Sequence, residues 1–456
     1  MVLRLARGGK TTILSLFFDE LQRQGCRVIF ITFNGSSNFQ RRQGESQRDA
    51  ILRLIATQLV DIGHNDPLNI QCDEQKLDDF IGELPFVLLI DELNALDTPV
   101  DSDARRMLRR LFLDKKDRYL VFTTHVPISL EPSDHLPSPR GCLTVPLYQC
   151  MEIHWLRNMS VQCEALTPSE VMLYGGIPSL IYSIKSMHEM TPSERFFRKF
   201  PPRSLASAPE LLKFFVASVL DGVRRPEIAM FDEFSFMPEV GKIRWPLCYI
   251  ACILETFEDN EATRAVRDNC AALSVSAQTT ESGKEWECVL NIAIIFRCQY
   301  QSYFGSDSPF DIVPLGIKPA VICRTIPAEL TTQVSIRDFI THSRSSCLSS
   351  GPCVLVLVPS YSKFPDFDGF VVYCPDASTE IIYGYQAKTK RTYPKRDCPD
   401  WVKEGLLLRG NSPTKGSLRK QWNYMSPDDV LSLLGYSLWP MYPASWPDFP
   451  PSDDFD

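Results

Sequence analysis

The stretch FVLLIDE, residues 86–92, decides the fold of the first part of this chain, together with GGKTT at residues 8–12. Five apolar residues run directly into Asp91 and Glu92, which predicts a strand buried inside a parallel sheet. Such a strand carries both carboxylates to the carboxyl edge of the sheet, where ligand sites form in open α/β folds. The glycines and the lysine of residues 8–12 are typical of a loop that cradles phosphate groups.

Helices and strands alternate around this stretch. Apolar residues at helical spacing and short β-branched runs predict helices over 11–24 and 49–61, and strands over 27–33, 86–90 and 119–124. The alternation predicts a parallel sheet with helices on both faces, within residues 1–150. Because only Met1–Leu3 precede the loop, the central strand is expected to be incomplete, and Arg4 stands where the loop template has a glycine.

These segments predict the nucleotide site of a P-loop NTPase. Backbone N–H groups of Gly8 and Gly9 would cradle the phosphates, and Lys10 would reach the β and γ oxygens. The hydroxyl of Thr11 would hold Mg²⁺, with Thr12 beside it in the first turn of the helix. The predicted ligand is therefore ATP, or another NTP, together with Mg²⁺.

The strand ends supply further candidate side chains. Asp91 would bind Mg²⁺ through water, and Glu92 would polarise the water that attacks the γ-phosphate. An acidic turn after a buried strand is the alternative. Thr123 and Thr124 end the next strand, where they would sense the γ-phosphate or bond backbone. We interpret an arginine cluster on a predicted helix as a solvated face and not an arginine finger: Arg105, Arg106, Arg109 and Arg110.

Two further regions follow the sheet. Residues 151–258 are predicted to form a helical lid or winged-helix-like module, because capping boxes with proline at the first helical position occur at 167–170 and 191–194. Between them, Gly175–Pro178 resembles the glycine-any-proline element in the lid of signal-transduction and archaeal-type AAA-like ATPases. Residues 259–456 are predicted to form an α/β domain with an irregular tail rich in proline and tryptophan.

The last domain contains a second set of candidate catalytic residues. Asp366 and Asp368 precede an apolar strand, and Asp368 abuts it and is the preferred metal ligand. Gln386 and Lys388 lie two apart at the end of the next strand, so both share one face. The arrangement matches a PD-(D/E)xK nuclease core, in which the acids bind Mg²⁺ and the lysine stabilises or activates the attacking water. Here the amide of Gln386 replaces the second acid.

A glutamate on an upstream helix completes such a core. The helix predicted over 284–297 offers Glu285 and Glu287, and we favour Glu287 because Trp286 and Val289 are expected to face the core. Two divalent cations and a lysine beside a phosphate would suit phosphodiester hydrolysis. Each piece alone is more often structural, since DxD is commonly a turn and Gln-x-Lys a solvent-facing pair.

Composition narrows the functional classes. The net charge of -8 argues against a uniformly basic nucleic-acid coat. Between Tyr383 and Trp422, however, ten Lys or Arg stand against three acids, which suits either a nucleic-acid backbone or a solvated loop face. Fifteen cysteines without a CxxC pair and six histidines without HxxxH spacing favour free thiols over zinc. No apolar run reaches membrane-spanning length and no signal-peptide core is present, so no membrane partner is predicted.

Taken in order, these motifs resemble the Crinkler effector family of oomycetes and its Crinkler-RHS relatives. The resemblance implies an AAA- or STAND-like P-loop NTPase domain, coupled to a restriction-endonuclease-like domain. It also implies secretion, delivery to the host cell and accumulation in the host nucleus. The matching segments are RLARGGKTT at 4–12, IFITFNG at 29–35, FVLLIDELNAL at 86–96, VFTTH at 121–125, GGIP at 175–178, GKEWE at 283–287, and FPDFDGF through QAK at 364–388.

Two functional hypotheses follow. In the first, the chain is a Mg²⁺-dependent DNA endonuclease that its NTPase module regulates or drives. In the second, it is a catalytically weak nucleotide-binding effector that acts by binding host nuclear partners. The chain starts without the trafficking domain and leader motif of the family, so a truncated gene model and a non-secreted intracellular paralogue are both open.

Overall fold

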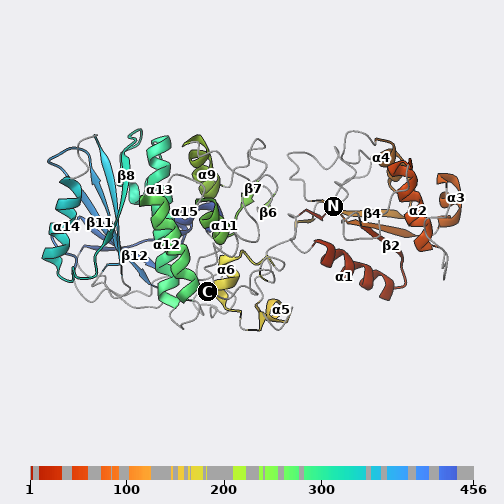
Figure 1. Cartoon of the computed structure of the whole chain (residues 1–456), viewed down its shortest axis with the longest axis horizontal. Coiled ribbons are helices and arrows are strands. Elements are labelled where there is room, and N and C mark those ends of the chain that lie inside the picture. The colour runs from red at the N-terminus through yellow and green to blue at the C-terminus, as the bar shows by residue number, and fades with distance from the viewer. Residues whose placement is uncertain are drawn as a thin grey trace. The chain divides into compact units, whose positions relative to one another are not determined.

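The computed structural model of the chain describes residues 2–3, 10–32, 44–59, 73–83, 85–91, 102–124, 145–146, 153–158, 163–164, 166–177, 181, 209–221, 236–239, 242–254, 261–276, 282–345, 351–360, 367–388, 397–409 and 421–438. They fall into two compact units. Unit 1 comprises residues 1–148 and 225–241, and unit 2 comprises residues 149–224 and 242–456. Each unit has its own sheet, covered by helices (Figure 1).

Unit 1 is an α/β structure. Its elements are β1 (Val2–Leu3), α1 (Lys10–Arg23), β2 (Arg27–Thr32), α2 (Gln47–Leu59), α3 (Glu74–Ile81), β3 (Phe86–Asp91), α4 (Ser102–Leu108), the π-helix η3 (Arg109–Leu113), β4 (Arg118–Thr124), β5 (Val145–Pro146) and β6 (Phe236–Glu239).

The sheet of unit 1 is parallel, with strand order β2-β3-β4-β1-β5. Its long strands are β2, β3 and β4, and their register sets Thr32 opposite Asp91. The central strand that we expected to be incomplete is present as the two-residue β1, which pairs with Thr123 and Thr124 of β4 and also with β5. The ends of β1, β3 and β4 therefore lie together at the carboxyl edge of the sheet.

Helices cover both faces of this sheet, as the alternating pattern predicts (Figure 1). Helix α1 packs on β2 and β3, where Leu14 is fully buried and the ring of Phe18 lies 6.2 Å from that of Phe30. The opposite face carries α2, α3, α4 and η3 around one hydrophobic core. The core contains Ile29, Ile31, Ile51, Leu52, Ile55, Leu77, Ile81, Phe86, Leu88, Ile90, Ala104, Met107, Leu108, Leu111, Phe112 and Phe122.

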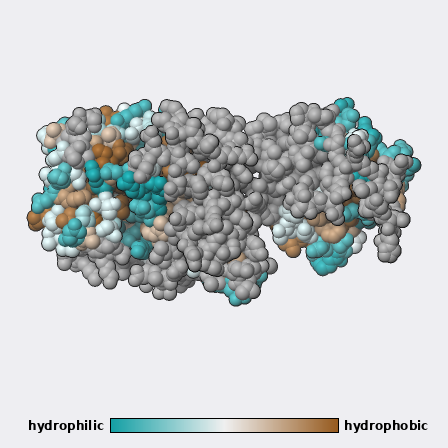
Figure 2. All heavy atoms as spheres, viewed as in Figure 1, coloured by the Kyte–Doolittle hydropathy of each residue, from teal (hydrophilic) through white to brown (hydrophobic). Residues whose placement is uncertain are grey.

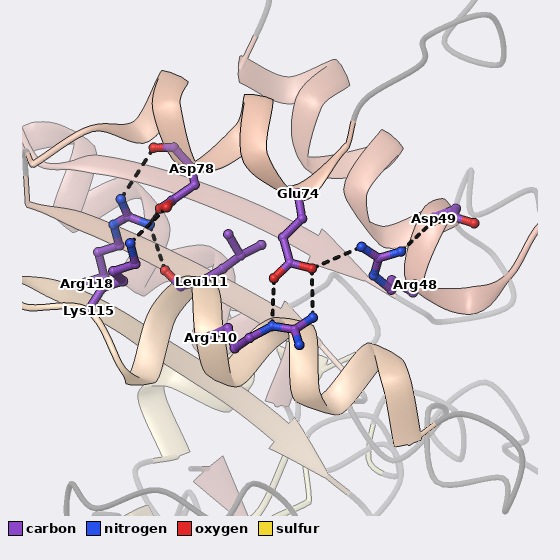
Figure 3. A network of polar contacts seen from close by, with 8 residues as sticks. All are labelled: Arg48, Asp49, Glu74, Asp78, Arg110, Leu111, Lys115 and Arg118. Atoms are coloured by element: carbon purple, nitrogen blue, oxygen red, sulfur yellow. Dashed lines mark hydrogen bonds and ion pairs between the residues drawn. The ribbon is translucent and has the colours of Figure 1, made fainter.

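Ion pairs connect α3 to α2, to η3 and to the start of β4 (Figure 3). Glu74 accepts hydrogen bonds from Arg48 of α2 and from Arg110 of η3. Burial alone would raise the pKa of Glu74, but the hydrogen bonds from Arg110 and Arg48 prevail and lower it. One turn later, Asp78 accepts from Lys115 and from the buried Arg118. The network explains part of the arginine cluster as structural, because Arg110 lies within it.

Unit 2 contains the remaining elements. They are α5 (Ile153–Arg157), α6 (Pro168–Leu173), α9 (Pro209–Asp221), β7 (Lys242–Arg244), α11 (Leu247–Leu254), α12 (Glu261–Ser276), α13 (Ser282–Phe304), the 3₁₀ helix η6 (Pro309–Asp311), β8 (Ala320–Ile326), α14 (Gln333–Ser345), β9 (Cys353–Pro359), β10 (Gly369–Cys374), β11 (Ile381–Lys388), β12 (Glu404–Arg409), β13 (Trp422–Tyr424) and α15 (Pro427–Leu438).

The sheet of unit 2 is mixed, with order β13-β12-β11-β10-β9-β8. Strand β10 is antiparallel to both its neighbours, and the other strand pairs are parallel. Helix α14 packs on one face through Ile336 and Ile340, in a core with the aromatic rings of Phe367, Phe370 and Trp422. Helix α13 lies along the other face and α12 packs beside it, as Figure 1 shows.

The predicted strands and helices mostly coincide with those observed, but the units differ from the predicted domains. Residues 151–258 and 259–456 lie mostly in one compact unit, since α9 packs against α13 and α15. The capping box at Thr167 and Glu170 is formed, whereas 191–194 lies outside the described residues. Within the described part of the chain, no helix is long and apolar enough to cross a membrane. Figure 2 shows hydrophilic and apolar side chains interspersed on the visible described surface.

Two glycines show how closely the second sheet is packed. A Cβ atom on Gly384 would lie 2.2 Å from Cε1 of Phe367, whose ring is itself held 5.2 Å from that of Trp422. We therefore expect Gly384→Ala to destabilise unit 2 by about 3 kcal/mol, measured by urea unfolding. Gly283→Ala is the matched control because a Cβ there meets nothing within 4 Å, and it should leave stability unchanged or slightly raised. Equal stability of the two variants would contradict the packing described.

Candidate functional site

The carboxyl edge of the first sheet holds a fully buried carboxylate among threonine hydroxyls. Asp91 ends β3 and is 0% exposed. Thr11 Oγ1 donates to Asp91 Oδ2 at 2.6 Å, and Thr123 Oγ1 donates to Asp91 Oδ1 at 2.7 Å. Thr32 Oγ1 lies 3.3 Å from Oδ2. A buried carboxylate is costly unless it is hydrogen-bonded, and these hydroxyls provide the required partners.

The order of the strands in the sheet brings the threonine hydroxyls and the Asp91 carboxylate together. Thr32 and Asp91 are opposite each other at the ends of β2 and β3, while Thr123 is the second-last residue of β4 on the other side. Thr11 comes from the first turn of α1, which begins at Lys10. The first N–H groups of a helix lack intrahelical partners and carry partial positive charge, so anions are favoured there. The site thus combines a carboxylate, hydroxyls and a helix N-terminus.

Some predicted nucleotide-site residues can be placed and others cannot. Lys10 opens α1 and Thr124 ends β4, but only their backbone is described; Thr12 is exposed beside Thr11. Of the two threonines weighed at the end of β4, the structure brings the hydroxyl of Thr123 to Asp91. Gly8, Gly9 and Glu92 lie outside the described residues.

Three of the four arginines of the cluster make ion pairs on the helix surface. Arg106 pairs with Asp103, and Arg109 pairs with Asp114, next to the Arg110–Glu74 pair of Figure 3. These contacts agree with the interpretation as a solvated face.

A second group of candidate residues surrounds Asp368 in unit 2. Asp368 directly precedes β10, and its N–H donates to Tyr385 O at 2.8 Å. Its Oδ2 accepts from the N–H of Ala387 at 2.6 Å. Both bonds join the start of β10 to the end of β11, so the carboxylate is fixed by backbone contacts and not by its rotamer alone. Asp366 lies outside the described residues.

Glu287 reaches this carboxylate from α13. Trp286 and Val289 are 0% exposed, as expected, and Trp286 Nε1 donates to Leu408 O at 3.3 Å, so the intervening Glu287 side chain is turned to the site. Burial raises the pKa of Glu287 to about 10, helped by its hydrogen bond to Asp368 and by the charge of that carboxylate. The positive charges of Lys388 and Lys284 act in the opposite direction. The raised pKa favours the protonated form of Glu287 beside Asp368.

The two carboxyl groups line a cavity of about 310 Å³ between α12, α13 and the end of the sheet. Its inner wall is held by a chain of hydrogen bonds, in which Tyr385 Oη donates to Asn291 Oδ1 at 2.6 Å and Asn291 Nδ2 donates to Asn269 Oδ1 at 3.1 Å. The described lining consists of Ala265, Asp268, Asn269, Ala272, Lys284, Glu287, Cys288, Asn291, Thr325, Val358, Pro359, Ser360 and Asp368. Sequence reasoning missed the contribution of α12, for which no motif gives a signal.

Gln386 and Lys388 lie at the end of β11, near this cavity but not among its described lining residues. Alternation along β11 places both on the face that carries Gly384 and Phe367, opposite the face on which Tyr385 reaches Asn291. Gln386 is 8% exposed, and its buried Oε1 has no hydrogen-bond partner among the residues that the structure describes. Buried amide oxygens normally accept a hydrogen bond, so a water molecule or a cation is expected at this oxygen.

The donor sets fit a hard cation better than zinc. Among the described residues, no group of three or more His, Cys, Asp or Glu side chains could hold a metal ion. Mg²⁺ typically takes only one or two carboxylates and completes its shell with water and phosphate oxygens. Asp91 with Thr11, and Asp368 with Glu287, are compatible with that pattern.

The protonation of Glu287 links folding stability to pH. Its pKa is raised from 4.5 to about 10 in the folded chain, so between these values the folded state binds a proton that the unfolded state has lost. The contribution of this group is fully present below pH 4.5 and is lost as pH rises towards 10, by at most about 1.4 kcal/mol per pH unit.

Urea unfolding in EDTA at about pH 6 and pH 8 measures this effect. Wild type should lose stability between the two pH values, and Glu287→Gln should lose less because it cannot titrate. Glu329→Gln is the matched control, since Glu329 is exposed and should retain the wild-type pH dependence. A Glu287→Gln variant with the wild-type pH dependence would show that Glu287 is ionised in the folded protein.

The lid-like tetrapeptide and the basic segment remain predictions. Gly175 and Gly176 have φ of +66° and +59° and end α6 in a buried turn of unit 2, while Pro178 is outside the described residues. Positive φ explains the two glycines without any ligand. Residues 389–396 and 410–420 of the basic segment also lie outside the described part.

Comparison with known proteins provides no independent assignment. No family model matches the chain, and no curated protein is similar to it in sequence. The two groups of residues around Asp91 and Asp368 are therefore the features of the chain that point to a function.

Proposed function

We propose that unit 1 binds Mg²⁺ with ATP or another NTP at the carboxyl edge of its sheet. The observation that carries this proposal is the 2.6 Å hydrogen bond from Thr11 Oγ1 to Asp91 Oδ2. In P-loop NTPases the cation is held by the hydroxyl that follows the loop lysine and by the aspartate at the end of a neighbouring strand. Thr11 and Asp91 have this order in the sequence and are already within hydrogen-bond distance.

The surrounding residues support phosphate binding. The N-terminus of α1 favours an anion, and Lys10 stands at its first position, with Gly8 and Gly9 preceding it. Mg²⁺ would offset negative charge on the β- and γ-phosphates. In this proposal Thr123 orients Asp91, and Glu92 polarises water.

Calorimetric titration tests the nucleotide site. Wild type should bind ATP in the presence of Mg²⁺, and Lys10→Ala should weaken binding at least about tenfold because one charge-assisted contact is worth about 1.5–3 kcal/mol. Lys76→Ala is the matched control: its ammonium is exposed on α3 of the same unit. Equal affinity of Lys10→Ala and wild type would exclude the P-loop assignment.

A second activity is proposed for unit 2, namely Mg²⁺-dependent cleavage of DNA. Two observations favour it: the carboxylate of Asp368 is held by the backbone N–H of Ala387, and the carboxyl group of Glu287 lies beside it in the same cavity. Lys388 is close enough for its charge to act on Glu287. A divalent cation held by Asp368 would stabilise charge on a scissile phosphate, and Lys388, whose charge acts on Glu287, would stabilise the attacking water.

Plasmid nicking with Mg²⁺ or Mn²⁺ tests this second activity. Wild type should nick the plasmid, and Lys388→Ala should abolish nicking, with ATP present or absent. The control is Lys403→Ala, whose ammonium lies over the ring of Tyr383 away from Asp368. Absence of nicking by folded wild-type protein would favour the alternative of an effector that binds nucleotide and host nuclear partners without turnover. Delivery to the host nucleus is part of the same proposal and rests on the family resemblance.

A further inference from the structure

We infer that Cys353 and Cys374 form a reactive dithiol, which a low-molecular-weight disulfide oxidises to a disulfide that joins β9 to β10. This modification site is separate from both proposed binding sites. It rests on the placement of the two thiols in the sheet, their contact with each other and the position of the pair at the ends of the strands.

Strand pairing places the two cysteines face to face. Cys353 begins β9 and Cys374 ends β10, and they are directly opposite in the antiparallel register. Directly opposed residues on antiparallel strands have Cα atoms about 4.5–5.5 Å apart, and disulfides span Cα separations of about 4.4–6.8 Å. The thiols are hydrogen-bonded to each other, and both are now free. A disulfide can therefore form without changing the strand register.

The two cysteines are buried, but exposed residues lie two positions away from each of them in the sequence. Both cysteines are 0% exposed. Gly351, two residues before Cys353, is exposed, and so is Asp376, two residues after Cys374. Ends of strands open more easily than their centres, so a local opening at this end of the hairpin is enough to admit a small disulfide.

The surroundings make one thiol the nucleophile. The hydrogen bond from Cys374 lowers the pKa of Cys353 to about 7, against the effect of burial and with help from the charge of Arg344. The same contact and burial raise the pKa of Cys374. Arg344, in the last turn of α14, also pairs with Glu380, whose charge acts on Cys374. A thiolate is the attacking species in disulfide exchange.

The two protein thiols and one glutathione disulfide are the only reactants that the oxidation needs. The Cys353 thiolate attacks one sulfur of glutathione disulfide, which forms a mixed disulfide and releases one glutathione thiolate. Cys374 then attacks the Cys353 sulfur, and its proton passes to the second departing glutathione. Two protein thiols and one glutathione disulfide thus become one protein disulfide and two glutathione molecules.

A third cysteine of the same core provides the internal comparison. Cys398 belongs to the hydrophobic core that contains Cys353 and Cys374. Burial, with the charge of Glu404, raises its pKa to about 12. Cys398 should therefore remain a thiol under conditions that oxidise the pair.

The test equilibrates the folded full-length protein with reduced and oxidised glutathione, followed by acid quench, alkylation in denaturant and peptide mapping. We expect a cross-linked Cys353–Cys374 peptide, loss of both thiols together, and full alkylation of Cys398. Cys374→Ala should instead accumulate one glutathione adduct on Cys353, and Cys398→Ala should still form the cross-link. The oxidised wild type should also unfold at a higher urea concentration than the reduced protein.

Two results would overturn the inference. One is full alkylation of both cysteines at every glutathione ratio at which near-ultraviolet circular dichroism shows a folded protein. The other is a set of cross-links in which Cys353 pairs with other cysteines as often as with Cys374. Because the pair lies at the end of the hairpin remote from Asp368, neither result bears on the proposed nuclease site.

Discussion

The Asp368→Asn variant is expected to lose metal-dependent nicking activity by a factor on the order of 10³ while keeping its fold. Asparagine retains the oxygen that accepts the 2.6 Å hydrogen bond from the N–H of Ala387, so the junction of β10 and β11 should persist. It removes the negative charge that would hold a divalent cation beside a phosphate. It also removes the charge of Asp368 that helps to raise the pKa of Glu287.

Initial rates of plasmid nicking over a Mn²⁺ titration measure this effect. Asp338→Asn is the matched control, because it removes an exposed carboxylate from α14 of the same unit and should leave the rate unchanged. Urea unfolding of all proteins checks that the fold is intact. If Asp368→Asn nicks at the wild-type rate while Lys388→Ala does not, the metal ligand has been misassigned; if both nick normally, the nuclease proposal fails.

The Asp91→Asn variant is expected to lose most of the gain in ATP affinity that Mg²⁺ gives to the wild type, on the order of 100-fold. Asparagine can accept one of the two hydroxyl hydrogen bonds, from Thr11 or Thr123, and its amide N–H can donate to the hydroxyl oxygen of the other threonine, so the buried strand end should stay in place. ATP without Mg²⁺ should bind wild type and variant similarly, since Lys10 and the N-terminus of α1 are unchanged. The effect is thus confined to the metal-dependent part of the binding free energy.

Calorimetric titrations with ATP in Mg²⁺ and in EDTA separate the metal-dependent part of the binding free energy from the metal-independent part. Asp103→Asn is the control, since its carboxylate is 71% exposed and pairs with Arg106 on the surface of the same unit. An Asp91→Asn variant that keeps the full Mg²⁺-dependent gain would show that Asp91 is a structural carboxylate held by threonines. Loss of binding in both buffers would indicate instead that the site had not folded.

The strands were predictable because most are buried on both faces and therefore appear as continuous apolar runs. Strand β3 extends one residue beyond its predicted end, to Asp91, and β2 ends one residue before its predicted end, at Thr32. Strand β12 was missed because its short run, EGLLLR, lies in a segment whose many lysines and arginines suggested a solvated loop. It is a strand because it pairs with β11, a contact that local sequence does not encode.

The choice between neighbouring candidate residues also depends in part on long-range contacts that local sequence does not encode. Glu287 was preferred to Glu285 from helical spacing alone, and the buried Trp286 and Val289 agree with that choice. Thr123 and Thr124 were equivalent in the sequence, because both end the same strand. Only the position of Asp91 on the adjacent strand decided that the hydroxyl of Thr123 is the one in contact.

The sequence by itself determined that the chain has two α/β regions, each with its own sheet. It also located acidic and hydroxyl residues at the ends of the strands. These features follow from local periodicity and from the burial of apolar runs. The tertiary structure alone decided that Thr11 contacts Asp91, that Glu287 and Asp368 line one cavity, and that Cys353 faces Cys374. Strand order and register bring together residues that are far apart in the chain, and the energy of those long-range contacts is absent from any local stretch of sequence.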